Sequence, residues 1–383
     1  MLGVGGNGAE DFMADRRDEE LQIARIEEAL APSGNGMGRR AFLGTAAAAA
    51  AAASLVSRSA FAGPPAPAAK GLAATPPAGF SPFAAPGRVV KVTKKDCLQA
   101  NQLYPKPEAA KEMLTRALTE LTGKPDLPTA IQQFLHKDDI VVVKVNGIAK
   151  QNMGTNKELV LPFLEGMLAA GIPAGNITVL EQYGDFLAGT RITPANVPAG
   201  IKVVTHGNGN ATMEYRLIPG TGTSTKFTRY LTEATAAINF ALIKDHSICG
   251  YTGQLKNMTH GCSINPHDFH VHHASPQIAQ MYAQDVIKSR VRLNIADGYK
   301  VMADGGPLWK RPEMVKIHEA VYASTDPVAM DTIGWEVVEK LRADLNLKTL
   351  TEAGREPAYI KAAGDLGLGV SDRSKITLKE VAI

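Results

Sequence analysis

The sequence predicts an α/β fold in which a mainly parallel sheet is flanked by helices, with irregular loop insertions. Residues 139–145 form an unbroken run of mostly β-branched side chains, which is typical of a strand buried on both faces. Apolar side chains then repeat at helical spacing over residues 159–168, and residues 177–180 form a second strand. This strand–helix–strand order predicts a parallel, right-handed βαβ unit.

The other elements continue the same alternation. Thr155 and Glu158 have the spacing of a capping box, so we expect the helix of the βαβ unit to begin there. Ser-Pro at 275–276 and Asp-Pro at 326–327 are typical helix starts. Further strands are predicted at residues 201–205, 236–243 and 291–295. The alternation over residues 89–383 therefore predicts one α/β domain.

The N-terminal region has the order of parts of a bacterial export signal. The twin arginine Arg39-Arg40 precedes an alanine-rich apolar run, and an A-x-A-like site ends at Ala62. We assign residues 1–62 to a twin-arginine signal and the Pro/Ala-rich residues 63–88 to a linker. The predicted location is the periplasm, and the twin-arginine translocase is the partner during export.

Composition narrows the classes of function. The chain has 41 basic and 38 acidic residues, and its mature part has no basic block, so nucleic acid is not a predicted partner. No apolar run predicts a stable membrane span. The three cysteines form no C-x₂-C pair, so an iron–sulfur cluster is not expected. Cys97 is expected to be buried and inert, whereas Cys249 and Cys262 could be ligands, a disulfide or inert.

Polar side chains follow four of the predicted strands. In open α/β sheets, ligands bind beyond the carboxyl ends of the strands, so these side chains are expected to line one crevice. They are Lys144 and Asn146 after the first strand, Glu181 after the second, Lys244, Asp245 and His246 after the strand that begins at Ala236, and Asp297 after the strand that begins at Val291.

Six of the nine histidines lie between residues 246 and 273. Imidazole is the commonest protein ligand for metals, and the H-x₂-H and H-x-H spacings here are compatible with a transition metal. A metal-free pocket that binds a carboxylate or phosphate through lysine and histidine is an equally weighted alternative. The candidate metal ligands are His246, His260, His267, His270, His272 and His273.

The same segment supplies candidate catalytic and ligand-binding residues. His246 beside Asp245 has the chemistry of a general acid or base. The candidate catalytic residues are Lys144, Lys244, Asp245, His246 and Lys256, and the candidate ligand-binding residues are Asn146, Asn257 and Asp297. Asp326 is expected to cap a helix, and Asp331 is placed to support a lysine or a metal ligand.

Several motifs together resemble those of the DUF362 family over most of residues 89–383. The motifs are Val143-Lys144-Val145-Asn146, Leu242-Ile243-Lys244-Asp245-His246, Thr252-Gly253-Gln254-Leu255-Lys256-Asn257-Met258, Ile295-Ala296-Asp297-Gly298, Gly305-Gly306-Pro307 and Ser324-Thr325-Asp326-Pro327-Val328-Ala329-Met330-Asp331. The resemblance implies an α/β fold and an exported protein. Some members carry ferredoxin-like cysteine clusters, and this chain departs from them.

The sequence therefore predicts an exported protein with a His/Lys/Asn-rich ligand or metal site. One hypothesis is a metal-dependent enzyme that acts on a small anionic metabolite, with the reaction class open. The alternative is a non-catalytic periplasmic protein that binds a metal or a ligand. An accessory factor for a redox partner is a third, weaker hypothesis.

Overall fold

The computed structural model describes residues 71–207 and 209–383. The predicted export signal and residues 63–70 of the predicted linker lie outside the described residues. Within the described part of the chain, no helix is long and apolar enough to cross a membrane.

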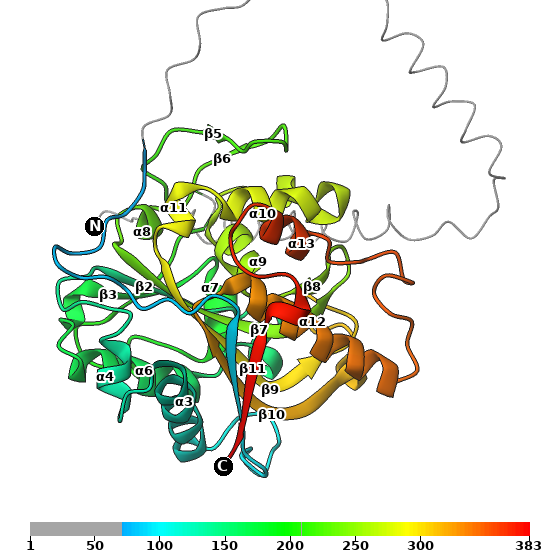
Figure 1. The fold of residues 1–383 in the computed structure, drawn as a ribbon, viewed down its shortest axis with the longest axis horizontal. Helices are drawn as coiled ribbons and strands as arrows, with labels where there is room; N and C mark the ends of the chain where they lie inside the picture. The colour runs from blue at the N-terminus through cyan, green and yellow to red at the C-terminus, as the bar shows by residue number, and fades with distance from the viewer. Residues whose placement is uncertain (1–70, 208) are drawn as a thin grey trace, which may run out of the picture. The chain divides into compact units, whose positions relative to one another are not determined.

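The fold is built on a nine-stranded mixed sheet (Figure 1). Its order is β11-β1-β10-β9-β7-β2-β3-β4, and β8 pairs with β7 outside this path. Five pairings are parallel and three are antiparallel. The prediction of an α/β fold with a mainly parallel sheet is confirmed. The strands are β1 (Arg88–Thr93), β2 (Val141–Lys144), β3 (Ile177–Glu181), β4 (Lys202–Thr205), β7 (Ala236–His246), β8 (Gly250–Thr252), β9 (Val291–Met302), β10 (Val315–Ser324) and β11 (Thr377–Ala382), and a separate pair is β5 (Arg216–Leu217) with β6 (Ser224–Thr225).

Helices cover both faces of the sheet. Alternate side chains of a strand point to opposite faces, and accordingly Val141 and Val143 join one core cluster while Val142 joins another. Helices α3, α4 and α6 belong to the first cluster, and α9, α10, α12 and α13 belong to the second. The helices are α3 (Pro107–Thr122), α4 (Leu127–Ile131), α5 (Lys150–Met153), α6 (Lys157–Ala169), α7 (Gly184–Thr190), α8 (Arg229–Thr232), α9 (Gln254–Thr259), α10 (Ser275–Tyr282), α11 (Asp285–Lys288), α12 (Pro327–Asp344) and α13 (Tyr359–Asp365).

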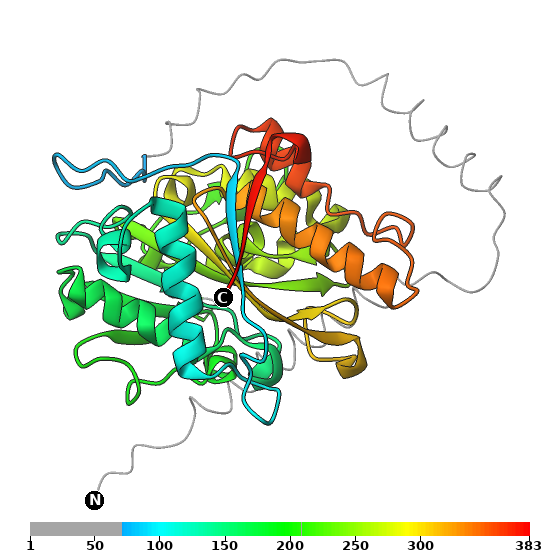
Figure 2. The same ribbon diagram turned by 60° about the horizontal axis from the view of Figure 1, so that its bottom comes forward.

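The predicted strands correspond to the parallel half of the sheet, and the antiparallel half was not predicted. Strands β7 and β9 both run several residues beyond their predicted ends. Strands β1, β10 and β11 were missed because their burial alternates or is partial, as in the half-exposed β10. Figure 2 shows β1 beside β11, which pair in parallel although they come from opposite ends of the described chain.

Two of the predicted helix starts lack the side-chain cap that the sequence indicated. No side chain caps α6: the Thr155 hydroxyl accepts a hydrogen bond from the Asn146 N–H at 3.0 Å, and Glu158 pairs with Arg191 at 2.6 Å. The capping box was overridden because both side chains serve tertiary contacts. Ser275 is the first residue of α10 and provides no cap either. Asp326 does cap α12, as expected.

Residues 72–87, which the sequence assigned to the linker, make defined contacts with the domain. The Leu72 N–H donates to Asp285 at 2.7 Å and the Ala74 N–H donates to the Ser289 hydroxyl at 2.9 Å. The Gly87 N–H donates to the Asp326 carboxylate at 2.9 Å. These backbone groups bind polar side chains of the domain, so the segment does not need a core of its own to be ordered.

Candidate functional site

The carboxyl ends of β2, β3 and β7 meet at one edge of the sheet, as the sequence predicted. Lys144 lies in register with Leu180 of β3 and with Asn239 of β7. Because β7 continues past the end of β2, its Lys244 reaches the loop after β2, where Nζ donates to Asn146 Oδ1 at 2.9 Å. Helix α9 brings Lys256 and Asn257 to the same place.

Lys144 is fully used in holding this edge together. Its Nζ donates to the carbonyl of Val145 at 2.5 Å, to Glu181 Oε1 at 3.0 Å and to Asn257 Oδ1 at 3.3 Å. An ammonium group has three N–H donors, and all three are satisfied. The Asn257 amide then donates to Asn239 Oδ1 at 2.8 Å, which links α9 to the centre of β7. Lys144 therefore positions Asn257 and Glu181 and has no donor left for a ligand.

Lys244 is in a different situation. Its side chain is buried, and within the described part of the chain Nζ bonds only to Asn146 Oδ1 and, at 3.5 Å, to the carbonyl of Pro307. Among the described residues no carboxylate lies within 4.0 Å of this amine. Burial, together with the nearby charges of Lys256 and Lys144 and against the opposing effect of Glu181, lowers the pKa of Lys244 to about 7.

Lys256 lies between two imidazoles. Its Nζ is 2.5 Å from His246 Nε2 and 3.0 Å from His270 Nε2. The backbone N–H of Ile248 donates to His246 Nδ1 at 3.1 Å, so the proton of the neutral ring is on Nε2 and faces the lysine. That contact needs the lone pair of an uncharged amine. Burial lowers the pKa of Lys256 to about 8, so this uncharged form is a minority near pH 7 and predominates above pH 8.

His260 completes what we call the lysine–histidine cluster: Lys244, Lys256, His246, His260 and His270. The His260 and His270 rings meet edge to face with 4.7 Å between centroids, and His246 stacks on His270 at 5.5 Å. Burial and the charge of Lys256 hold the pKa values of all three histidines well below their usual range. All three rings are therefore neutral at physiological pH.

The other three candidate histidines lie at the margin of the cluster or outside it. His267 is tilted against His270 with 6.5 Å between ring centroids. His272 and His273 are exposed and adopt left-handed backbone conformations, with φ of 51° and 56°. His273 Nδ1 bonds to the carbonyl of Ile248 at 3.0 Å, which holds the loop near β8.

The six histidines do not assemble as one ligand set. Over residues 71–207 and 209–383, no group of three or more His, Cys, Asp or Glu side chains is placed to hold a metal ion. Only His246 and His270 direct Nε2 towards a common point, and the Lys256 amine fills it. His260 Nε2 faces the Phe269 carbonyl at 3.2 Å, where it donates a proton and has no lone pair for a metal. The three cysteines are free and buried.

Two predicted acidic residues have other contacts. Asp245 accepts from Arg355 at 2.8 Å and from the Gly306 N–H at 3.1 Å, and burial raises its pKa to about 6. No contact joins its carboxylate to the His246 ring beside it in sequence. Asp297 accepts from the backbone N–H of Asn156 at 2.7 Å and therefore anchors the start of α6. The structure places neither carboxylate in the lysine–histidine cluster.

Two important contacts were not identified from the sequence. Asp331 of α12 accepts the backbone N–H groups of Gln254 at 2.6 Å and Leu255 at 3.0 Å, so it caps α9 and supports Lys256 from behind. The sequence suggested a supporting role for Asp331 but not its partner. His206, directly after β4, bonds through Nε2 to the carbonyl of Gly261 at 3.0 Å. The position of His206 at the end of a predicted strand could have identified it from the sequence.

The fold and this edge define an α/β protein with a buried lysine–histidine cluster at the carboxyl ends of its parallel strands. The chain belongs to the DUF362 family: the family model, described as a domain of unknown function, matches residues 141–336, more than half of the chain. The matched segment contains the whole cluster.

Other comparisons add little. No curated protein matches the sequence. A solved structure of the lactate racemase apoprotein from Thermoanaerobacterium thermosaccharolyticum is 13% identical, with a TM-score of 0.39, and the match covers 66% of this chain. The match spans 57% of the racemase chain, and a likeness this low carries no argument about function.

Proposed function

We propose that the lysine–histidine cluster binds a small anionic metabolite and transfers protons to or from it. The observation that carries this proposal is a pair of buried lysines, Lys244 and Lys256, with no carboxylate partner among the described residues. A buried cation without a counter-ion is costly, and an anionic ligand would supply the missing charge.

The anion is assigned to Lys244. This lysine has one strong acceptor, Asn146 Oδ1, and keeps donor capacity for a carboxylate or phosphate oxygen. Unlike Lys144, it is not tied to an acidic side chain. A ligand in this position would also raise the fraction of Lys244 that is protonated, because an opposite charge favours the charged form.

Proton transfer is assigned to Lys256 with His246. An amine with a pKa of about 8 exchanges protons readily near neutral pH, where an ordinary lysine remains protonated. The Nε2–H of His246 faces this amine, so a proton accepted on one side of the pair can be shared with the other. The buried Nδ1 of His270 has no partner among the described residues. Because His270 Nε2 accepts from Lys256, Nδ1 carries the ring proton and is a further donor for a ligand or water.

Hydrogen exchange in D₂O tests both halves of the proposal. The full chain would be incubated with acetate, malonate, glycolate and phosphate, with binding measured by calorimetry and exchange of carbon-bound hydrogen by NMR. We expect a carboxylate to bind and to exchange, Lys256→Met to abolish exchange while binding persists, and Lys361→Met, at an exposed site on α13, to change neither. Binding without exchange in the unaltered protein would favour a non-catalytic binding protein.

A metal-dependent enzyme is the second candidate, and it rests on the convergence of His246 and His270 Nε2. A metal there would have to displace the Lys256 amine, and two imidazoles alone do not complete a site. Elemental analysis of the purified protein decides this. About one transition-metal ion per chain, lost in the His246→Ala/His270→Ala double variant, would support the metal-dependent enzyme over the metal-free one.

We also propose that the protein is exported to the periplasm by the twin-arginine translocase. The support is Arg39-Arg40, the following apolar run and the small-residue site at Ala62. Because this route exports folded proteins, the lysine–histidine cluster would already be assembled when the protein crosses the membrane, with or without a cofactor.

A further inference from the structure

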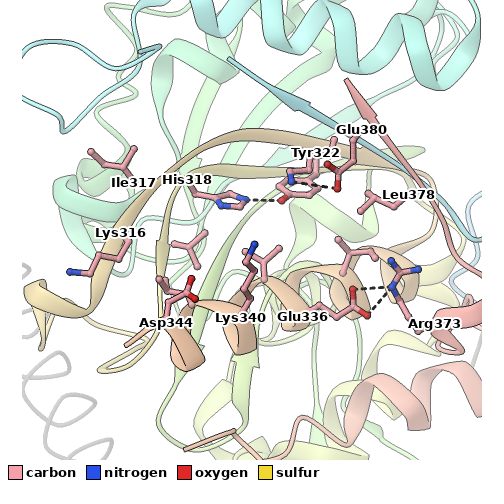
Figure 3. Close-up of a pocket in the computed structure, with 15 residues that line it drawn as sticks. Lys316, Ile317, His318, Tyr322, Glu336, Lys340, Asp344, Arg373, Leu378 and Glu380 are labelled. Atoms are coloured by element: carbon pink, nitrogen blue, oxygen red, sulfur yellow. Dashed lines mark hydrogen bonds and ion pairs between the residues drawn. The ribbon is translucent and has the colours of Figure 1, made fainter. Parts of the chain in front are cut away.

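A cavity away from the lysine–histidine cluster lies between α12 and β10, with β11 at one side (Figure 3). Its volume is about 420 Å³, within the range of sites for small organic ligands. None of its lining residues belongs to the lysine–histidine cluster. The lining consists of Lys91, Val301, Lys316, Ile317, His318, Tyr322, Ile333, Glu336, Val337, Lys340, Leu341, Asp344, Arg373, Leu378 and Glu380.

The cavity follows from a bulge in β10. The pairing of β10 with β9 shifts register between Ile317 and Ala320, and Glu319 has a positive φ of 52°. A bulge bends a strand and re-aims its side chains. Beneath it, Ile333, Val337 and Leu341 recur every fourth residue along α12 and so present an apolar stripe to the cavity.

The charges around this apolar floor are unevenly paired. Lys91 pairs with Glu380 at 3.6 Å, and Arg373 pairs with Glu336 at 2.8 Å. Neither Lys340 nor Lys316 has a carboxylate within 4.0 Å among the described residues, and Asp344, one turn beyond Lys340 along the helix, is unpaired too. Figure 3 shows Lys340 rising from α12 towards the strand above it.

A neutral hydrogen-bonding pair faces Lys340 from β10. His318 Nε2 and the Tyr322 hydroxyl are 2.7 Å apart, and their ring planes are parallel. Burial, together with the charges of Lys91 and Lys340, lowers the pKa of His318 to about 4, so the ring carries no charge at neutral pH. The cavity thus combines an apolar floor, two cations and one carboxylate without an ion pair among the described residues, and a neutral polar edge.

We propose that this cavity is a second ligand site, which binds a small amphiphilic carboxylate. The apolar part of the ligand lies on Val337, Leu341 and Leu378, its carboxylate meets Lys340, and the His318–Tyr322 pair hydrogen-bonds to it. A bare inorganic anion would leave the floor uncovered, and a neutral apolar molecule would leave Lys340 without a partner.

The test uses 4-phenylbutyrate as the probe and 4-phenylbutanol as its uncharged counterpart, with calorimetry and saturation-transfer NMR on the full chain. We expect saturable binding of 4-phenylbutyrate, weaker binding of the alcohol and about a tenfold loss of affinity for the acid in Lys340→Met. Leu341→Gln should weaken both probes. Lys361→Met and Lys244→Met should change neither, because they lie outside this cavity.

Three results would overturn the proposal: no saturable binding, equal affinity for the acid and the alcohol, or an affinity for the acid that Lys340→Met leaves unchanged. Loss of binding in Lys244→Met alone would also overturn it, because the probe would then occupy the lysine–histidine cluster. Lys340 is exposed, so Lys340→Met tests the charge even if Leu341→Gln fails to fold.

Discussion

Lys244 and Lys256 are the residues on which the proposed function depends. Each amine is buried away from water, and the charges of Lys256 and Lys144 also act on Lys244. The protein responds by lowering both pKa values rather than by providing a carboxylate. Such perturbed groups gather at functional sites more often than at structural ones.

The lowered pKa of Lys244 makes a prediction about stability. The unfolded chain keeps the ordinary lysine pKa of 10.5, whereas the folded pKa is about 7. Between these values the unfolded state binds more protons, so the free energy of unfolding contributed by this group rises with pH and is lowest below pH 7. We expect Lys244→Met to stabilise the protein at pH 6 by more than at pH 10, as measured by urea denaturation.

Lys361→Met is the matched control, because its lysine is exposed on α13 and pairs only with Asp365. It should show no pH-dependent gain. A stability difference between Lys244→Met and the unaltered protein that stays constant from pH 6 to pH 10 would contradict the lowered pKa.

Helix α9 adds the residues that complete the candidate site at the edge of the sheet. It is only six residues long and carries Lys256 and Asn257. Short helices depend on their tertiary contacts, and here the buried Asp331 accepts two of the N–H groups at the start of α9. The carboxylate acts across two elements that are distant in sequence.

Asp331→Asn should therefore disturb the lysine–histidine cluster, although Asp331 is not one of its residues. The asparagine oxygen can accept from one N–H, but its NH₂ group would face the other donor. We expect a loss of about 1–3 kcal/mol in the free energy of unfolding and weaker anion binding. Urea denaturation and calorimetry check both, and Asp365→Asn on the exposed face of α13 is the control. Unchanged binding in Asp331→Asn would show that α9 does not need this cap.

The sequence predicted those elements whose pattern is local. The β-branched run predicted β2, and the polar residues at the ends of β2, β3 and β7 lie at one edge of the sheet, as expected. The metal hypothesis gave all six histidines the same role. Tertiary folding places His246, His260 and His270 near Lys256 and leaves His272 and His273 exposed, and the sequence spacing does not show this difference. The cap from Asp331 to α9 joins residues far apart in sequence, and no local spacing encodes such a contact.

At the scale of the whole molecule, the long β7 and β9 bring the two halves of the sheet together. The parallel half provides the lysine–histidine cluster, and the antiparallel half with α12 provides the cavity beside β10. Both belong to the part of the chain that the structure describes, and the proposed export signal precedes it.

Export makes a separate prediction for the full-length chain. Replacement of Arg39 and Arg40 by lysine should leave the protein in the cytoplasm at its full length, because the translocase reads the arginine pair. Cell fractionation with mass measurement checks both location and length. A lysine-pair variant that still reaches the periplasm would contradict the twin-arginine route.

The most direct test of the account is the pH dependence of anion binding. The dissociation constant of malonate would be measured by calorimetry at pH 6 and pH 9.5 for the full chain and for Lys244→Met. We predict binding at pH 6 that weakens at least about tenfold at pH 9.5, as Lys244 loses its proton, and that is largely lost at both pH values in Lys244→Met. Equal affinity at both pH values, or unaltered binding in Lys244→Met, would contradict the central claim that these buried lysines form an anion-binding site.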